Sequence, residues 1–162
     1  MNRARQNKRG FSLIELVIVV VIIAIIGAIA IPKMSRGAAG AGDSALIQDL
    51  SVLRSAVDLY NSEHPSAQLS SSSTILQVTS ALTLYSDISG NTSSTKTAAC
   101  IYGPYLKSLP TLPVGTNKTL STLTVTGPVG TGTFAWYFDG TTFWANDPAS
   151  DTDATGKQYN AY

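Results

Sequence analysis

A single carboxylate lies inside the most apolar segment of the chain. Glu15 follows a basic stretch that ends at Gly10, and apolar side chains continue almost without interruption over residues 11–31. An ionised side chain among apolar groups costs free energy unless a cation pairs with it. Glu15 is therefore a candidate functional residue, and the chemistry it offers is ion pairing. The alternative is a polar side chain near a helix end that reaches water.

A second set of candidates is a group of carboxylates late in the chain, Asp147, Asp151 and Asp153. Closely spaced carboxylates in a loop are typical of Ca²⁺ sites, because this cation takes several oxygen ligands in flexible geometry. The spacing does not follow the EF-hand pattern. Two interpretations stay open, a structural Ca²⁺ site and a solvated acidic turn.

No catalytic constellation accompanies these residues in the sequence. The chain has one histidine, His64, and one cysteine, Cys100. It contains no nucleophile motif, phosphate-binding loop or Cys/His metal spacing, so we do not expect an enzyme. One cysteine excludes an intramolecular disulfide, and we expect Cys100 to be a small buried apolar side chain. We expect His64 to be a polar surface residue.

The charges are distributed unevenly along the chain. The 162 residues carry a net charge of +1, and the first ten contain four basic side chains and no acidic one. Without those ten residues, seven basic and ten acidic side chains remain, a net charge of −3. No basic patch predicts nucleic-acid binding. A basic leader before an apolar segment predicts that the leader stays cytoplasmic and that the rest lies across the membrane.

Residues 11–31 are long enough to cross a membrane as a helix. At about 1.5 Å per residue, the segment extends roughly 31 Å, which matches the hydrocarbon core. An ordinary secretory signal is cut after its apolar region. Here the better cleavage site precedes that region, at Gly10, so that cutting removes only the basic leader. The alternative is a single-pass anchor that is never cut.

The string KRGFSLIE at residues 8–15, with the apolar run that follows, resembles the prepilin signal of type IV pilins and type II secretion pseudopilins. The resemblance implies that a prepilin peptidase cleaves after Gly10 and that the new amine of Phe11 is methylated. It also implies that Glu15 pairs with the N-terminal amine of a neighbouring subunit. Such a pair would penalise wrong axial registers during filament assembly.

The residues after the apolar segment predict two helices. Residues 43–61 carry apolar side chains at spacings of three and four, which indicates an amphipathic helix. Whether it continues the first helix is open, because residues 33–42 are rich in glycine. The second helix is predicted over residues 75–85, with Thr74 as its cap. We expect its inward-facing residues to be Ile75, Leu76, Leu82 and Tyr85.

The last third of the chain predicts strands. Residues 120–126 alternate threonine with apolar residues, and residues 133–138 and 141–145 flank Asp139-Gly140. Asp-Gly between aromatic and β-branched runs is a strong signal of a hairpin with a two-residue turn. We expect these aromatic side chains in the core.

Two further strings resemble the major, G-like pseudopilins. LRSAVDLY at residues 53–60 is similar to the end of their long helix, and residues 102–110 are similar to the segment that follows their helical part, although the usual Asp-Pro is absent. Some G-like pseudopilins carry a structural Ca²⁺ in their C-terminal loop, which implies the same for the three aspartates.

The predicted fold class is α+β, a long N-terminal helix packed on a small antiparallel sheet. We expect residues 1–10 to be a leader that is removed and residues 11–31 to form the transmembrane and filament-core helix. Residues 32–162 would form the head, with the amphipathic helix 43–61.

The resemblance implies a structural subunit of a type II secretion pseudopilus. The alternative is a type IV pilus pilin for adhesion, twitching motility or DNA uptake. The implied location is the bacterial inner membrane with the head in the periplasm, and the filament in the periplasm or at the cell surface. The implied partners are further copies of the chain, the prepilin peptidase, minor pseudopilins or pilins, a platform protein and an assembly ATPase.

Overall fold

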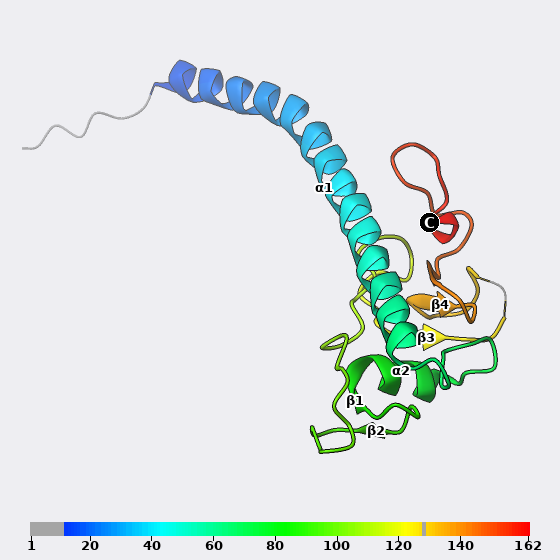
Figure 1. Cartoon of the computed structure of the whole chain (residues 1–162). Helices are drawn as coiled ribbons and strands as arrows, with labels where there is room; N and C mark the ends of the chain where they lie inside the picture. The colour runs from blue at the N-terminus through cyan, green and yellow to red at the C-terminus, as the bar shows by residue number, and fades with distance from the viewer. Residues whose placement is uncertain (1–11, 128) are drawn as a thin grey trace, which may run out of the picture. The chain divides into compact units, whose positions relative to one another are not determined.

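The computed structural model describes residues 12–127 and 129–162, and the side chains of residues 29–39 lie outside that description. Gly10 and Phe11 therefore lie outside the described residues. The chain forms two compact units, residues 1–38 and 39–162, which we describe separately. Helix α1, Leu13–Glu63, contributes to both (Figure 1). It includes the predicted amphipathic helix and runs without interruption through the glycine-rich residues 33–42.

The first unit is the beginning of α1. Its described side chains after Ser12 are apolar except for Glu15. Within the part of the chain that the structure describes, no helix combines the length and the apolarity that crossing a membrane requires.

The second unit contains the rest of α1 and all other elements. These are α2 (Ile75–Thr83), β1 (Tyr85–Ser86), β2 (Thr92–Ser93), β3 (Leu123–Thr124), β4 (Trp136–Phe138), β5 (Phe143–Ala145) and the 3₁₀ helix η1 (Tyr159–Ala161). The order of strands is β1-β2 in one sheet and β3-β4-β5 in the other. The α+β class predicted from the sequence is confirmed.

The three-stranded sheet is mixed rather than antiparallel. β4 and β5 form an antiparallel hairpin, as predicted, with Phe138 opposite Phe143. The prediction of a two-residue turn at Asp139-Gly140 was wrong, because residues 139–142 connect the strands and the N–H of Asp139 donates to the carbonyl of Thr142. β3 pairs with β4 in parallel, with Leu123 opposite Trp136, so the prediction of an antiparallel sheet was wrong for this pair. Parallel strands need a connection that runs back from the end of one strand to the level at which the other begins. The chain between β3 and β4 is long enough to do this, whereas a tight turn would not be.

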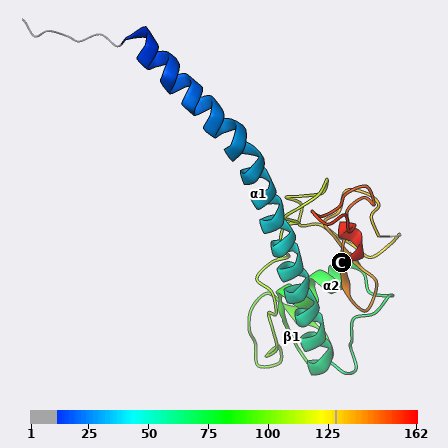
Figure 2. The same ribbon diagram turned by 90° about the horizontal axis from the view of Figure 1, so that it is seen from above.

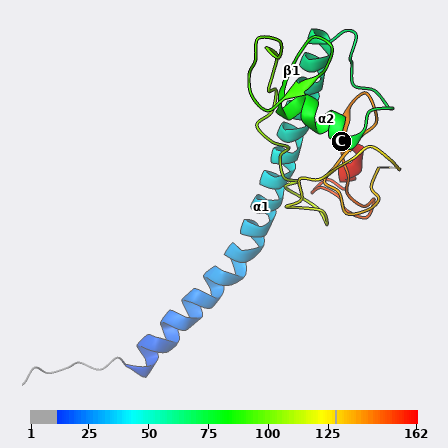
Figure 3. The ribbon, with the colours of Figure 1, turned by 90° about the horizontal axis from the view of Figure 1, so that it is seen from below.

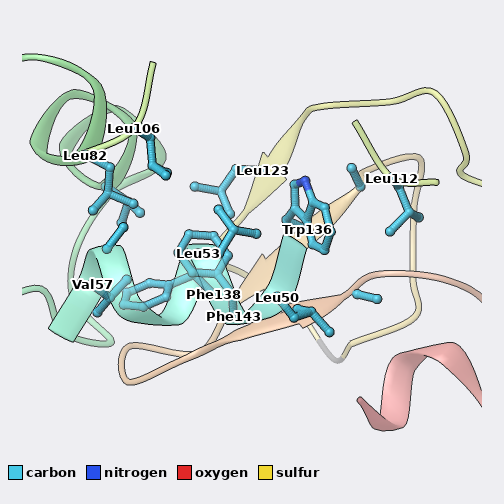
Figure 4. Close-up of a cluster of buried hydrophobic side chains, with 14 of the residues drawn as sticks. Leu50, Leu53, Val57, Leu82, Leu106, Leu112, Leu123, Trp136, Phe138 and Phe143 are labelled. Carbon is cyan, nitrogen blue, oxygen red and sulfur yellow. The ribbon is translucent and has the colours of Figure 1, made fainter. Parts of the chain in front are cut away.

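The hydrophobic core lies between α1 and the mixed sheet. Leu50, Leu53 and Val57 recur on one face of α1 and are at most 1% exposed. They pack against the aromatic side chains of the β4–β5 hairpin, including the fully buried Trp136 and Phe143 (Figure 4). Each large apolar side chain buried here stabilises the fold by about 1.5–3 kcal/mol, so this layer holds the second unit together.

Helix α2 lies next to the last turns of α1, as Figure 2 and Figure 3 show from opposite sides. Thr74 caps it as predicted, in a capping box with Gln77. The residues it buries are Val78, Ala81 and Leu82. Leu82 is buried as predicted, but the inward positions predicted for Ile75 and Leu76 were wrong, because both side chains are exposed. Tyr85 was also predicted in this helix, but α2 ends at Thr83 and Tyr85 lies half-buried in β1.

His64 is a core residue, so the prediction of a surface histidine was wrong. Its ring stacks on Tyr60 at 4.1 Å between centroids. Its Nδ1 lies 2.9 Å from the carbonyl oxygen of Tyr60, and its Nε2 lies 3.0 Å from the hydroxyl of Ser86. The imidazole thereby links the end of α1 to β1. Cys100 is buried and free, as predicted.

Candidate functional site

Glu15 lies in the first turn of α1, where the structure gives its carboxylate a local partner. The backbone N–H of Ser12 donates to Oε2 of Glu15 over 3.2 Å, and the N–H of Leu16 donates to the carbonyl of Ser12. A glutamate at the third helical position that accepts from the cap residue is half of a capping box. The carboxylate also lies at the positive end of the helix dipole. The spacing of Ser12 and Glu15 carried this signal, which our sequence reading missed.

An exposed apolar surface surrounds Glu15. The large apolar side chains of residues 13–26 are between 47% and 81% exposed. Glu15 is the one ionisable residue among residues 12–28. Contiguous exposed apolar surface of this kind marks contact with a membrane or with other protein. Once this surface is covered, the carboxylate needs a cation or further donors, because local capping uses one N–H only.

Among the C-terminal carboxylates, Asp147 is the most deeply buried. It is 0% exposed, and its Oδ1 accepts a hydrogen bond of 2.9 Å from the N–H of Asn117. Its Oδ2 is buried without a hydrogen-bond partner in the part of the chain that the structure describes. The oxygen fits against Gly115, where a Cβ would lie 1.2 Å from it, so a side chain there would displace the carboxylate.

Asp151 lies beside the same loop. Its Oδ2 accepts a hydrogen bond of 2.6 Å from the N–H of Thr116. The side chain of Thr116, and to a smaller extent this N–H, hold the pKa of Asp151 below its usual value. Burial raises the pKa of Asp147, and the negative charge of Asp151 raises it further. The structure thus brings these two predicted residues onto adjacent backbone N–H groups.

Asp153 is engaged elsewhere. Its carboxylate accepts hydrogen bonds from Tyr162, Thr155 and the N–H of Lys157, and its pKa is lowered, chiefly by the hydroxyl of Tyr162. In the described residues, no group of three or more His, Cys, Asp or Glu side chains is placed to hold a metal ion. The three aspartates therefore do not form one three-carboxylate cluster. Asp147 is buried, unlike a solvated turn.

Two asparagines that the sequence analysis did not single out shape the site. The side chain of Asn117 donates to the carbonyl of Asn146 over 2.6 Å. Asn146 is 0% exposed, and its own side chain donates to the carbonyl of Thr131 and accepts from the N–H of Gly130. No local pattern signals these contacts, because their partners are far apart in the sequence.

The loop that carries the aspartates is anchored to α1. The hydroxyl of Tyr159 donates to Asp43 over 2.8 Å, and burial together with this bond raises the pKa of Tyr159 to about 12. The guanidinium of Arg54 donates to the carbonyls of Phe143 and Tyr162. These contacts hold the loop and the hairpin on the same helix.

Comparison with known proteins adds two similarities. Residues 5–31 match the family described as the prokaryotic N-terminal methylation motif. A stretch of 67 residues is 33% identical to the type II secretion system core protein G of Klebsiella michiganensis. The match covers 40% of this chain and 47% of that relative, so the chain spans about half the length of the curated relative. No solved structure matches.

Proposed function

We propose that this chain is a structural subunit of a type II secretion pseudopilus. A prepilin peptidase cleaves it between Gly10 and Phe11 and methylates the new amine. Residues 11–31 then hold it in the inner membrane with the head in the periplasm. A platform protein and an assembly ATPase transfer it into a helical filament, together with minor pseudopilins. The growing filament drives folded proteins across the outer membrane.

The observation that carries the proposal is the exposed apolar surface of residues 13–26 around a single carboxylate. A soluble domain would not keep such a surface in water. A lipid bilayer covers it before assembly, and the same segments of other subunits cover it afterwards. The head needs no such partner, because it contains its own core.

Glu15 sets the register between subunits. Before assembly its carboxylate caps the helix through Ser12. In the filament it pairs with the amine of Phe11 on a neighbouring subunit, because a cation offsets the cost of a carboxylate in a covered apolar bundle. A subunit docked in the wrong register leaves the charge unpaired, which costs several kcal/mol.

The deciding experiment compares proteins in the culture medium of a deletion strain, the wild type and the complemented deletion strain. We expect several folded exoproteins to disappear from the medium and to accumulate in the periplasm, and complementation to reverse this. An unchanged set of secreted proteins would contradict a role in secretion.

A type IV pilus pilin is the second candidate, because the prepilin signal is common to both kinds of filament. The resemblance of residues 53–60 to the helix end of G-like pseudopilins and the single cysteine favour secretion. The same strains separate the two functions. Loss of surface fibres, twitching motility or DNA uptake with normal secretion would assign the chain to a pilus.

We also propose that a Ca²⁺ ion stabilises the head at Asp147 and Asp151. The support is the buried Oδ2 of Asp147, which has no partner among the described residues, and the neighbouring charge of Asp151. Both features are costly for a protein without a cation and favourable beside one. Carbonyl oxygens and water would supply the remaining ligands, and Asp153 would not take part. Loss of Ca²⁺-dependent stabilisation of the head in Asp147→Asn, with the gain kept in Asp153→Asn, tests this proposal.

A further inference from the structure

A cavity of about 600 Å³ opens beside α2, between the loop of residues 67–73 and the turn of residues 89–92. It belongs entirely to the second unit and is distant in sequence from Glu15 and from the aspartates. The helix α2 forms one wall through Leu76, Gln77 and Ser80. Neither the proposed filament nor the proposed Ca²⁺ ion uses this pocket, which we call the α2 pocket.

The chemistry of the α2 pocket excludes several classes of ligand. Its described lining side chains are mostly hydroxyls and amides, with apolar groups that include Leu69 and Leu76, and none carries a formal charge at neutral pH. An anion would find no lysine or arginine there, and a cation no carboxylate, so a charged ligand would lose its hydration without compensation. An apolar ligand would leave the hydroxyls and amides unsatisfied. A neutral polar ligand remains.

Three amides in the α2 pocket are oriented before any ligand binds. Gln77 accepts from the N–H of Thr74 through its carbonyl oxygen, so its amide N–H₂ is the group it can offer. Gln68 and Asn91 use their N–H₂ groups, the latter as a donor to Asp87 over 2.9 Å, and so offer carbonyl oxygens. The pocket therefore presents fixed donors and fixed acceptors together. Each sugar hydroxyl can both donate and accept, and so fits either kind of group.

An apolar contact completes the match. Leu76 lines the pocket and is 76% exposed, so its side chain is free to contact a ligand. A pyranose ring has one face of C–H groups that needs such a surface. The hydroxyls of Ser70 and Ser72, which lie 2.9 Å apart, can reorient to meet a ligand hydroxyl.

We infer that the α2 pocket binds a short neutral oligosaccharide. Gln77 donates to it, Gln68 and Asn91 accept from it, and Leu76 covers one ring face. This binding belongs to the single subunit and does not require a filament, so its test is independent of the proposed function.

The test is a titration of the full-length chain in a detergent without a sugar headgroup. Binding is monitored through the NMR chemical shifts of the backbone amides. The probes are cellotriose, maltotriose and chitotriose. We expect at least one of them to shift the amides of residues 67–73, 76–80 and 89–92 in a saturable way, with the rest of the head unchanged. If none of the three shifts these amides, the inference is wrong.

A matched pair of variants sharpens the test. Gln77→Glu keeps the oxygen that completes the capping box but removes the amide donor and adds a charge. We expect the same thermal midpoint and a roughly tenfold weaker affinity, because one hydrogen bond is lost. Gln48→Glu makes the same change on an exposed position of α1 outside the pocket and should bind as the wild type does.

Two further results would overturn the inference, even if a sugar or another probe shifted the pocket amides. Equal affinity of Gln77→Glu and the wild type would show that the sugar binds elsewhere. A blocked, uncharged tripeptide that shifts the pocket amides while all three sugars leave them unchanged would assign the pocket to polypeptide.

Discussion

The two compact units of the chain differ in the exposure of their apolar side chains. In residues 39–162, the apolar face of α1 meets the aromatic hairpin, and Leu53 and Trp136 are 0% exposed. In residues 12–28, which belong to the first unit, every large apolar side chain remains exposed. The head is therefore stabilised by its own apolar contacts, whereas the apolar side chains at the beginning of α1 have no such contacts in the described residues. In the proposed function, a membrane or other subunits cover them. Variants in the two units should separate assembly from folding.

The largest expected effect comes from the residue before the cleavage site. Gly10→Val should leave the chain uncleaved, because a side chain at this position obstructs a protease that grips an extended backbone. The measurement is the size of the protein on a gel, with the head stability unchanged. A mature band of normal size would contradict the assignment of the leader.

Replacing Glu15 should abolish filaments without affecting cleavage or membrane insertion. Glu15→Ala removes both the cap of Ser12 and the charge. Glu15→Gln is the sharper variant, because the amide oxygen still accepts from Ser12 but cannot form an ion pair. We expect both variants to accumulate as mature membrane protein and neither to assemble, as seen by electron microscopy of sheared filaments.

The two variants distinguish the possible roles of the carboxylate. If Glu15→Gln assembles and Glu15→Ala does not, the residue acts as a helix cap and the pairing role is wrong. If both assemble, neither role matters for the filament.

Changes in the core should have the converse effect. Trp136→Ala should destabilise the head by about 3–5 kcal/mol, because it opens a cavity in the core and leaves the carbonyl of Pro110 without its indole donor. Trp144 is a matched control in the same hairpin, half-buried and bonded to Asp139. We expect Trp144→Ala to cost less than half as much. Thermal unfolding, monitored by circular dichroism, measures the stability of both variants. Equal losses of stability would contradict the assignment of Trp136 to the core.

How far the sequence predicted the structure depended on whether the signal was local. The cap of α2 at Thr74 and the pairing of β4 with β5 as a hairpin follow from neighbouring residues, and the structure has both, although the turn covers residues 139–142 rather than Asp139-Gly140 alone. The burial of His64 and the parallel pairing of β3 with β4 follow from contacts between distant segments. Local patterns carry no information about such contacts, so single-sequence reasoning missed them.

The candidate sites divide in the same way. Ser12 and Glu15 are one helical turn apart, and their spacing alone signals the cap. The surroundings of Asp147 come from Gly115 and Asn117, which precede it by about thirty residues. The sequence could indicate that aspartates gather late in the chain. It could not indicate that Asp147 is buried while Asp153 is held by its own turn.

The smallest expected effect concerns Asp147 in the absence of Ca²⁺. Its pKa is raised in the folded head by burial, so the folded state binds its proton more tightly than the unfolded state does. The resulting loss of folding stability is absent below the unfolded pKa of 3.8. It grows as the pH rises from there to the folded-state pKa and is complete above it. In EDTA at neutral pH, Asp147→Asn should therefore be as stable as the wild type or more stable, by up to about 1 kcal/mol. The difference should shrink near pH 3.8.

Excess Ca²⁺ should reverse that order. The wild type should gain about 2.7 kcal/mol when free Ca²⁺ is about a hundredfold above its Kd, and Asp147→Asn should gain much less. Asp153→Asn serves as the control, because that carboxylate is held by its own turn and should leave the Ca²⁺-dependent gain in place. A wild type that gains nothing from Ca²⁺ would leave Asp147 as a buried carboxylate that the head tolerates at a cost.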